Sequence, residues 1–126
     1  MKNKQLQEIV DYLTKKYSPL AILMCGSRVY GKPRPDSDWD LLLITEKRKD
    51  RIKKTWKGYN LDVHVVNENY FKHNFAPDWA PPIAKSIILK DTGNVGEKLI
   101  YFMKKFLKSE RFLKYKREYA RIGNKK

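Results

Sequence analysis

One stretch of the chain, from Cys25 to Ile44, constrains the fold most strongly. It reads CGSRVYGKPRPDSDWDLLLI: an apolar strand at residues 20–25 breaks at a Gly-Ser pair, and a second apolar strand follows two aspartates. Because side chains alternate faces along a strand, Asp38 and Asp40 point the same way if this strand begins near Asp38. The stretch therefore predicts a site for a metal ion and a phosphate.

The aspartates are the metal-binding half of this prediction. Two carboxylates on one face repel each other, and a hard divalent cation with oxygen ligands, such as Mg²⁺, relieves the repulsion. A third acid, Asp62, interrupts the apolar run 61–66, where a charge facing the core needs a reason. His64 would share its face, but no second histidine lies nearby to complete a zinc site. Asp36 is read as a turn residue after Pro35.

The Gly-Ser break is the phosphate-binding half. Gly26 permits close approach of the backbone, and backbone N–H groups together with the hydroxyl of Ser27 can hold phosphate oxygens. Residues 27–30 are expected to form a short helical turn, closed by Gly31, with its N-terminus towards the anion. Arg28 would add positive charge for nucleotide binding, although an exposed arginine at a helix start is more often simply solvated.

These residues resemble the signature of the nucleotidyltransferase superfamily, which has a polymerase-β-like domain, and most of all its minimal nucleotidyltransferases. The resemblance rests on Gly26-Ser27, Gly31, the run 34–40 (RPDSDWD) and the apolar LLLI that follows, and it covers roughly the first two thirds of the chain. It implies a mixed α+β fold, a small mixed β-sheet flanked by helices. One departure is Tyr30, at a position that is often arginine in the small family.

The resemblance implies specific roles. Asp38, Asp40 and Asp62 would be catalytic and bind divalent metal, Mg²⁺ or alternatively Mn²⁺, while Gly26 and Ser27 would hold a nucleoside triphosphate. Asp62 would favour deprotonation of an attacking hydroxyl, which displaces pyrophosphate from the α-phosphorus. The implied reaction is a two-metal transfer of a nucleoside monophosphate, with AMP from ATP favoured, to a hydroxyl of a protein, an RNA or a small molecule.

A second interpretation from another class stays open. The chain could be an antitoxin-like or partner-binding module, with little catalysis of its own, that resembles the minimal nucleotidyltransferase accompanying an all-helical HEPN-type toxin. The two interpretations overlap, since members of that group can modify the toxin by adenylylation. A small-molecule transferase of the aminoglycoside-inactivating kind is less favoured, because such enzymes usually carry additional substrate-binding structure.

Length and composition limit the organisation of the chain. Its 126 residues suit a single domain, 1–126, with a core at about 1–93 and a helical segment at about 95–122. The single Cys25 cannot form an internal disulfide and reads as a buried small residue. Neither a signal sequence nor a membrane-spanning run is evident, so we expect a cytoplasmic protein.

The remaining elements follow from periodicity and turn residues. We expect a helix at residues 6–17, ending before Pro19, a Lys- and Arg-rich solvated loop at 46–57, and a turn at 58–60. A strand at 61–66 would follow, then a short helix with an irregular Pro-bearing stretch at 67–85, and a last strand at 86–90.

The carboxy-terminal segment is expected to form one long helix from about Val95 to Ile122, with Ser109 as the place where it could break. One face is strongly basic; its residues are Lys104, Lys105, Lys108, Arg111, Lys114, Lys116, Arg117, Arg121, Lys125 and Lys126. This face fits the formal net charge of +14 and could attract RNA, DNA or an acidic protein, although a charge run is more often a solvated face. The helix could also make a homodimer or dock a partner.

Overall fold

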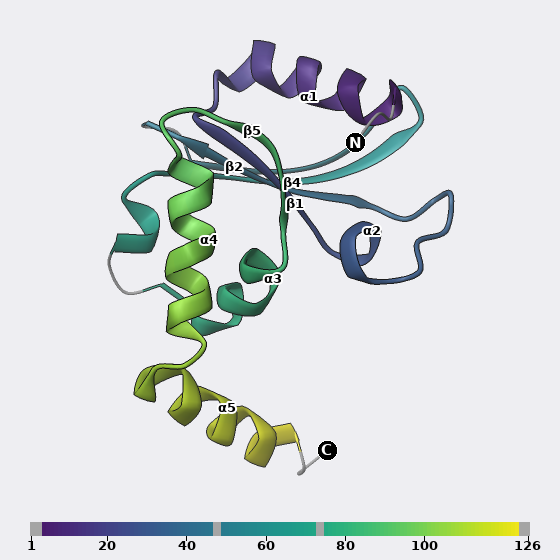
Figure 1. The fold of residues 1–126 in the computed structure, drawn as a ribbon. Coiled ribbons are helices and arrows are strands. Elements are labelled where there is room, and N and C mark those ends of the chain that lie inside the picture. The colour runs from purple at the N-terminus through teal and green to yellow at the C-terminus, as the bar shows by residue number, and fades with distance from the viewer. Residues whose placement is uncertain (1–3, 47–48, 73–74, 124–126) are drawn as a thin grey trace.

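A five-stranded sheet with the order β3-β4-β2-β1-β5 forms the centre of the molecule in a computed structural model, which describes residues 4–46, 49–72 and 75–123 (Figure 1). The strands are β1 (Ala21–Cys25), β2 (Trp39–Thr45), β3 (Asp50–Trp56), β4 (Tyr59–Asn67) and β5 (Ile87–Asp91). β2 and β4 run parallel, and the other neighbouring pairs are antiparallel. The expected α+β fold with a small mixed sheet flanked by helices is confirmed.

One face of the sheet is covered by α1 (Lys4–Tyr17), which Figure 1 shows above the strands. Its buried Leu6, Ile9 and Leu13 recur at helical spacing, so they share one side of the helix. They pack against strand residues that include Ile22, Met24, Leu41, Leu43 and Val63. The helix ends two residues before Pro19, as predicted, because a residue that precedes proline is disfavoured in helical geometry.

The opposite face is covered by α3 (Ala80–Ala84) and α4 (Val95–Phe106), together with two 3₁₀ turns, η1 (Tyr70–Lys72) and η2 (Pro77–Trp79). This second core contains Leu23, Leu42, Ile44, Ile83, Leu99 and Met103. Alternation along β2 therefore sends Leu41 and Leu43 towards α1, and Leu42 and Ile44 towards α4. Asp40 is two residues before Leu42 and so belongs to the α4 side of the sheet.

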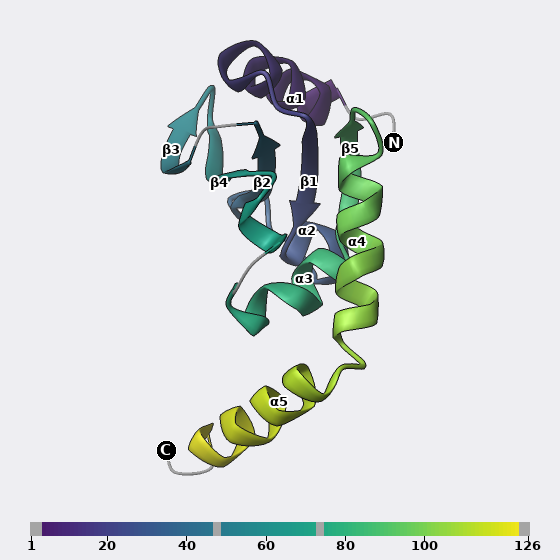
Figure 2. The ribbon, with the colours of Figure 1, turned by 90° about the vertical axis from the view of Figure 1, so that its left-hand side faces the viewer.

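The carboxy-terminal segment forms two helices and not the one long helix expected, and the interruption lies near Ser109, where the sequence allowed a break. α5 (Glu110–Gly123) follows α4 after a short turn and extends away from the sheet (Figure 2). The hydroxyl of Ser109 accepts a hydrogen bond from the backbone N–H of Phe112 at 3.2 Å, which caps α5. Arg111 fastens the first turn of α5, because it donates to the carbonyl oxygen of Phe75 at 2.6 Å.

The prediction of a solvated loop at 46–57 is wrong for residues 50–56, which form β3; residues 47 and 48 lie outside the described residues. β3 pairs antiparallel with β4, from Asp50 opposite Val65 to Trp56 opposite Tyr59. Ile52 and Trp56 pack against the α1 core, and the Trp56 ring stacks on a ring of α1 at 4.3 Å. Apolar burial on alternate residues thus outweighs the solvation of the lysines between them.

No helix within the described part of the chain is long and apolar enough to cross a membrane.

Candidate active site

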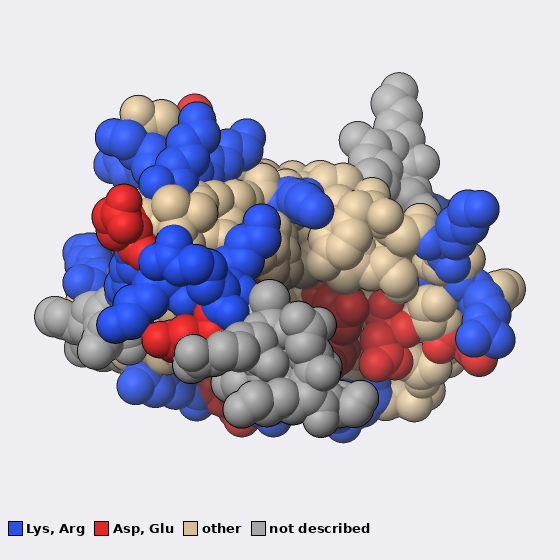
Figure 3. Space-filling model, turned by 90° about the horizontal axis from the view of Figure 1, so that it is seen from below, with Lys and Arg blue, Asp and Glu red and all other residues tan. Residues whose placement is uncertain are grey.

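Three predicted acids meet at one end of the sheet. Asp40 in β2 is paired in register with Asp62 in the parallel strand β4, and Asp38 immediately precedes β2. One carboxylate oxygen from each residue lies within 4.8 Å of the other two. Seen from below, the surface shows acidic side chains gathered in a hollow between uncharged residues, with Lys and Arg on either side of the view (Figure 3). The fold therefore brings all three acids together.

The three carboxylates raise the free energy of one another's charged forms. The pKa of Asp40 is raised above its usual range by burial, and then by the neighbouring charges of Asp62 and Asp38. Three oxygen donors of hard character at this separation suit a hard divalent cation such as Mg²⁺ or Mn²⁺. The donor set thus fits the metal that the sequence predicts, and Asp38, Asp40 and Asp62 are the residues that would hold it.

Gly26 is held directly against the acids. Its φ is 80° and its ψ is −162°, a conformation that is essentially confined to glycine. A Cβ atom on this residue would lie 2.0 Å from the Oδ2 atom of Asp40. Only glycine therefore lets the Gly-Ser turn follow β1 and still leave room for the Asp40 carboxylate.

The turn continues into α2 (Ser27–Tyr30), the short helical turn expected from the sequence. The carbonyl oxygen of Gly26 accepts hydrogen bonds from the backbone N–H groups of Val29 and Tyr30, at 3.0 and 3.3 Å. Gly31 closes the turn, since its N–H donates to the Ser27 carbonyl at 2.9 Å. The amides of Ser27 and Arg28 precede the first hydrogen bond of the helix, and they follow Gly26, the residue that touches Asp40. The phosphate-binding role of Gly26 and Ser27 stays a prediction.

Arg28 is tied to the loop that leads into β2. One guanidinium nitrogen donates to the carbonyl oxygen of Ser37 at 2.8 Å and to that of Pro35 at 3.3 Å. The guanidinium carbon lies 3.9 Å from the centroid of the Trp39 ring. The Nε atom is buried and has no hydrogen-bond partner among the described residues. In this structure Arg28 therefore connects α2 to the segment that carries Asp38, and its binding of nucleotide stays a prediction.

Two basic residues of β3 flank the acids and were not singled out from the sequence. Arg51 forms a two-pronged ion pair with Asp62, at 3.0 Å from Nε and 3.3 Å from the second nitrogen. Lys53 lies opposite Asp62 in register, and its charge lowers the pKa of Asp40 against the opposing effects of burial and the acids. The sequence signal that could have revealed β3 was Lys57-Gly58. A two-residue turn of this kind between two segments of alternating polar and apolar residues is typical of a β-hairpin.

A small pocket of about 200 Å³ opens beside the acids. Asp40 and Gly26 line one part of it, and Tyr30, Trp79 and His64 contribute aromatic surface. The ring of His64 meets Trp79 edge-to-face at 5.1 Å. Burial is the main cause that lowers the pKa of His64, followed by the charge of Arg51. His64 does share the α4 side of the sheet with Asp62, where it packs on an aromatic ring.

Cys25 also lines this pocket, at the end of β1. Burial and the nearby charge of Asp40 raise the pKa of its thiol to about 12. Because the thiolate is the reactive form, a thiol with this pKa is a poor nucleophile at neutral pH. The expectation that Cys25 is no nucleophile therefore fits the structure, but its side chain is partly buried and not fully enclosed.

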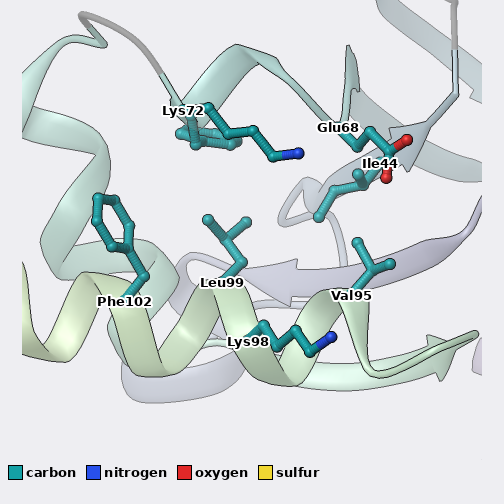
Figure 4. Close-up of a pocket in the computed structure, with 8 residues that line it drawn as sticks. Ile44, Glu68, Lys72, Val95, Lys98, Leu99 and Phe102 are labelled. Atoms are coloured by element: carbon teal, nitrogen blue, oxygen red, sulfur yellow. The ribbon is translucent and has the colours of Figure 1, made fainter.

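A larger cavity, of about 430 Å³, lies towards the other end of β2 (Figure 4). Ile44, Leu99 and Phe102 supply apolar walls, and Lys72 from η1 and Lys98 from α4 also line it. None of Asp38, Asp40, Asp62, Gly26 or Ser27 is among the residues that line it. This cavity is therefore separate from the acid cluster.

The sequence matches one protein family. A family model described as a nucleotidyltransferase domain matches residues 6–121. No curated protein matches the sequence.

Solved structures of similar fold include a nucleotidyltransferase-like protein from Exiguobacterium sibiricum 255-15, at 12% identity and a TM-score of 0.55. That similarity covers 79% of this chain and 38% of the other, so this chain spans well under half of that protein. A toxin-antitoxin structure with AMP-PNP is similar at 16% identity and a TM-score of 0.57, over 94% of this chain and 96% of that one.

A third similar structure is a mutant of the toxin-antitoxin MntA-HpeT, in which two aspartates two positions apart are changed to glutamate. It is 14% identical, with a TM-score of 0.56, and the similarity covers 94% of this chain and 96% of that one. At these identities the likeness shows the fold.

Proposed function

The chain belongs to the nucleotidyltransferase domain family, and we propose that it is a Mg²⁺-dependent enzyme that transfers AMP from ATP to a hydroxyl group. The observation that carries this proposal is the meeting of Asp38, Asp40 and Asp62 within 4.8 Å, beside a glycine turn. The same three acids would accept Mn²⁺ in place of Mg²⁺.

The reaction is an in-line displacement at the α-phosphorus of ATP. The acceptor oxygen forms a bond to this phosphorus, the bond to the bridging oxygen of the β-phosphate breaks, and pyrophosphate leaves with the electron pair. Two bound metal ions supply charge stabilisation for the entering and the leaving oxygens. Positioning and charge neutralisation account for most of the rate in such transfers, so few other protein groups are needed.

The chain's own residues divide this work. Gly26 and Ser27 would hold the phosphates through backbone amides and the hydroxyl, and Arg28 and the basic residues of β3 would supply positive charge. Asp62 would accept the proton of the attacking hydroxyl on one of its carboxylate oxygens. Arg51 already donates to Asp62 and so fixes the orientation of that carboxylate.

The acceptor would be a hydroxyl of a protein, an RNA or a small molecule. Seven exposed basic side chains lie between residues 104 and 117, on the end of α4, the turn after it and the start of α5, and they favour an anionic acceptor such as RNA or an acidic protein; they are Lys104, Lys105, Lys108, Arg111, Lys114, Lys116 and Arg117. Arg111 is already bonded to Phe75, which leaves the other six for such contacts. A cytoplasmic location would give the enzyme access to ATP as donor.

The test is incorporation of labelled nucleotide from each labelled NTP in the presence of Mg²⁺, with and without the product of the neighbouring gene as acceptor. Asp38→Asn together with Asp40→Asn is expected to abolish incorporation and leave the chain folded, as judged by circular dichroism. Asp36→Asn is the matched control, because Asp36 lies in the same loop and is not part of the acid cluster. Undiminished incorporation by the double variant would overturn the metal assignment.

A second candidate function is an antitoxin-like role in a pair with a HEPN-type toxin. Its support is the likeness to two toxin-antitoxin structures over 94% of this chain and 96% of theirs. Toxin neutralisation in cells separates the two candidates. If the Asp38→Asn, Asp40→Asn variant neutralises the toxin as well as the wild type, binding alone suffices; if it fails while still binding the toxin, neutralisation needs the transfer.

A further inference from the structure

Tyr30 is an exposed aromatic side chain beside the acid cluster. It is the last residue of α2, and it is 52% exposed. Its ring lies 5.6 Å from the ammonium of Lys85, which approaches it from the chain segment after α3. A large ring kept in solvent next to a proposed nucleotide site has no part in the transfer derived above. Its position suggests that it contacts a ligand instead.

The pocket next to Tyr30 has mainly ring and apolar walls. Tyr30 comes from α2, Trp79 from η2, Pro82 from α3 and His64 from β4, so four separate elements supply its sides. Among the described residues that line it, Asp40 is the one with a carboxylate, and none is a lysine or an arginine. Aromatic and proline surfaces suit the faces of a flat, uncharged ring better than a phosphate, and the nearby ammonium of Lys85 lies against the Tyr30 ring and is not part of the lining.

The pocket is continuous with the phosphate side of the site. Gly26, from the turn proposed to hold phosphates, and Asp40 both line it, whereas Asp38 and Asp62 do not. Asp62 is the acid proposed to face the acceptor hydroxyl. A group in this pocket would therefore be attached to the nucleotide and not to the acceptor. The cavity of about 430 Å³ touches none of these residues and does not meet this requirement.

We propose that the pocket formed by Tyr30, Trp79, Pro82 and His64 receives the base of the nucleotide, an assignment that rests on the proposed function. At about 200 Å³ the pocket has room for one ring system, less than the space that a complete drug-sized ligand occupies. Tyr30 covers the base from the solvent side, and Trp79 presents its ring from η2. The ribose then connects the pocket to the α-phosphorus at the acids.

Two magnesium-bound probes distinguish the contribution of the base to binding affinity from that of the phosphates. Isothermal titration with AMP-PNP measures both contributions, and titration with tripolyphosphate measures the phosphates alone. Tyr30→Ala is expected to weaken AMP-PNP binding about tenfold, the scale of one lost base-stacking contact, and to leave tripolyphosphate binding unchanged. Tyr30→Phe should bind both probes as the wild type does, because it keeps the ring.

Tyr101→Ala is the matched control, since Tyr101 is a tyrosine of α4 that is 63% exposed and does not line the pocket. An independent measurement uses fluorescence of the wild type: AMP-PNP should quench tryptophan emission, tripolyphosphate should not, and Trp79→Phe should remove the quench. This second readout does not require the alanine variant to fold.

The outcomes distinguish this proposal from the proposed function. If tripolyphosphate binds and AMP-PNP binds no tighter, or if Tyr30→Ala weakens both probes equally, the base assignment is overturned and the transfer site stands. If Tyr30→Ala leaves AMP-PNP affinity intact but raises the KM of the acceptor, the pocket belongs to the acceptor. If the wild type binds neither probe with Mg²⁺, the proposed function fails as well.

Discussion

At the scale of single residues, the site depends on a close contact between Gly26 and Asp40. The turn residue has a positive φ, and its Cα faces the carboxylate that a metal ion would use. The sequence suggests the glycine as a place for close backbone approach, but the contact itself joins the turn after β1 to Asp40 in β2, fourteen positions further along the chain. Ser27 and Arg28 then depend on Gly26, because it sets the direction in which α2 begins.

Gly26→Ala is expected to lower Mg²⁺ affinity at least tenfold and to destabilise the fold by about 1–3 kcal/mol, since the new Cβ displaces Asp40 and the backbone is strained. Gly58→Ala is the matched control: Gly58 has a φ of 82° and nothing within 4 Å of the added Cβ. It should cost about 1–2 kcal/mol of stability and leave the Mg²⁺ affinity intact. Calorimetric titration measures the Mg²⁺ affinity of each variant, and thermal melts measure its stability. Equal Mg²⁺ affinities in the two variants would show that the contact between Gly26 and Asp40 does not matter for metal binding.

Residue identity alone also left Arg28 with two interpretations. Sequence reasoning favoured a charge near the phosphates, or a solvated side chain. The structure shows a guanidinium that donates to the carbonyl oxygens of Pro35 and Ser37 and lies over the Trp39 ring, and its contact with a nucleotide stays a prediction. These partners come from the loop before β2, whose path follows from tertiary packing and has no signature in the sequence.

At the scale of elements, β3 is the part of the fold that the sequence analysis misassigned. Its density of Lys and Arg is typical of a solvated segment, yet Ile52 and Trp56, four residues apart, share one face of the strand and pack against the α1 core. As an edge strand it also carries lysines, which discourage pairing with a further strand. The consequence for function is that Arg51 and Lys53 lie beside the acids.

Arg51→Gln is expected to raise Mg²⁺ affinity severalfold, because Arg51 neutralises Asp62 and so competes with a cation for that carboxylate. The free energy of unfolding should change little, since the Arg51 side chain is 52% exposed and exposed ion pairs contribute little to stability. Lys57→Gln, in the turn of the same hairpin, controls for the loss of one positive charge. An Arg51→Gln affinity equal to that of Lys57→Gln would show that the ion pair does not affect metal binding.

At the scale of the whole molecule, two apolar cores on opposite faces of one sheet hold an acidic cluster inside a protein of net charge +14. The cluster is costly without a cation: the raised pKa of Asp40 means that the folded state keeps this proton to higher pH than the unfolded state. The unfolded state therefore binds fewer protons in that window, and stability falls as pH rises through it.

Asp40→Asn is accordingly expected to melt a few degrees higher than the wild type at pH 7 in the presence of a chelator, because it removes one of three repelling charges. Below the usual pKa of aspartate the difference should vanish, since Asp40 is then protonated in both states. Excess Mg²⁺ should stabilise the wild type by about 2.7 kcal/mol at a hundredfold over its Kd and leave the variant nearly unchanged. Melts at both pH values, with and without Mg²⁺, check this; a variant less stable than the wild type in chelator would contradict it.

The sequence by itself determined the strand and helix periods, the Gly-Ser break, the placement of Asp38 and Asp40 on one face, and the family, because these depend on spacing within short segments. It left open whether the carboxy-terminal helix breaks near Ser109, and the structure shows that it does. Tertiary structure decided which strands are neighbours. The parallel pairing of β2 with β4 set Asp62 beside Asp40, the pairing of β3 with β4 brought Arg51 to Asp62, and the packing of η2 and α3 placed Trp79 and Pro82 near Tyr30. These contacts join residues distant in the chain, and the burial of apolar surface over the entire sheet selects them.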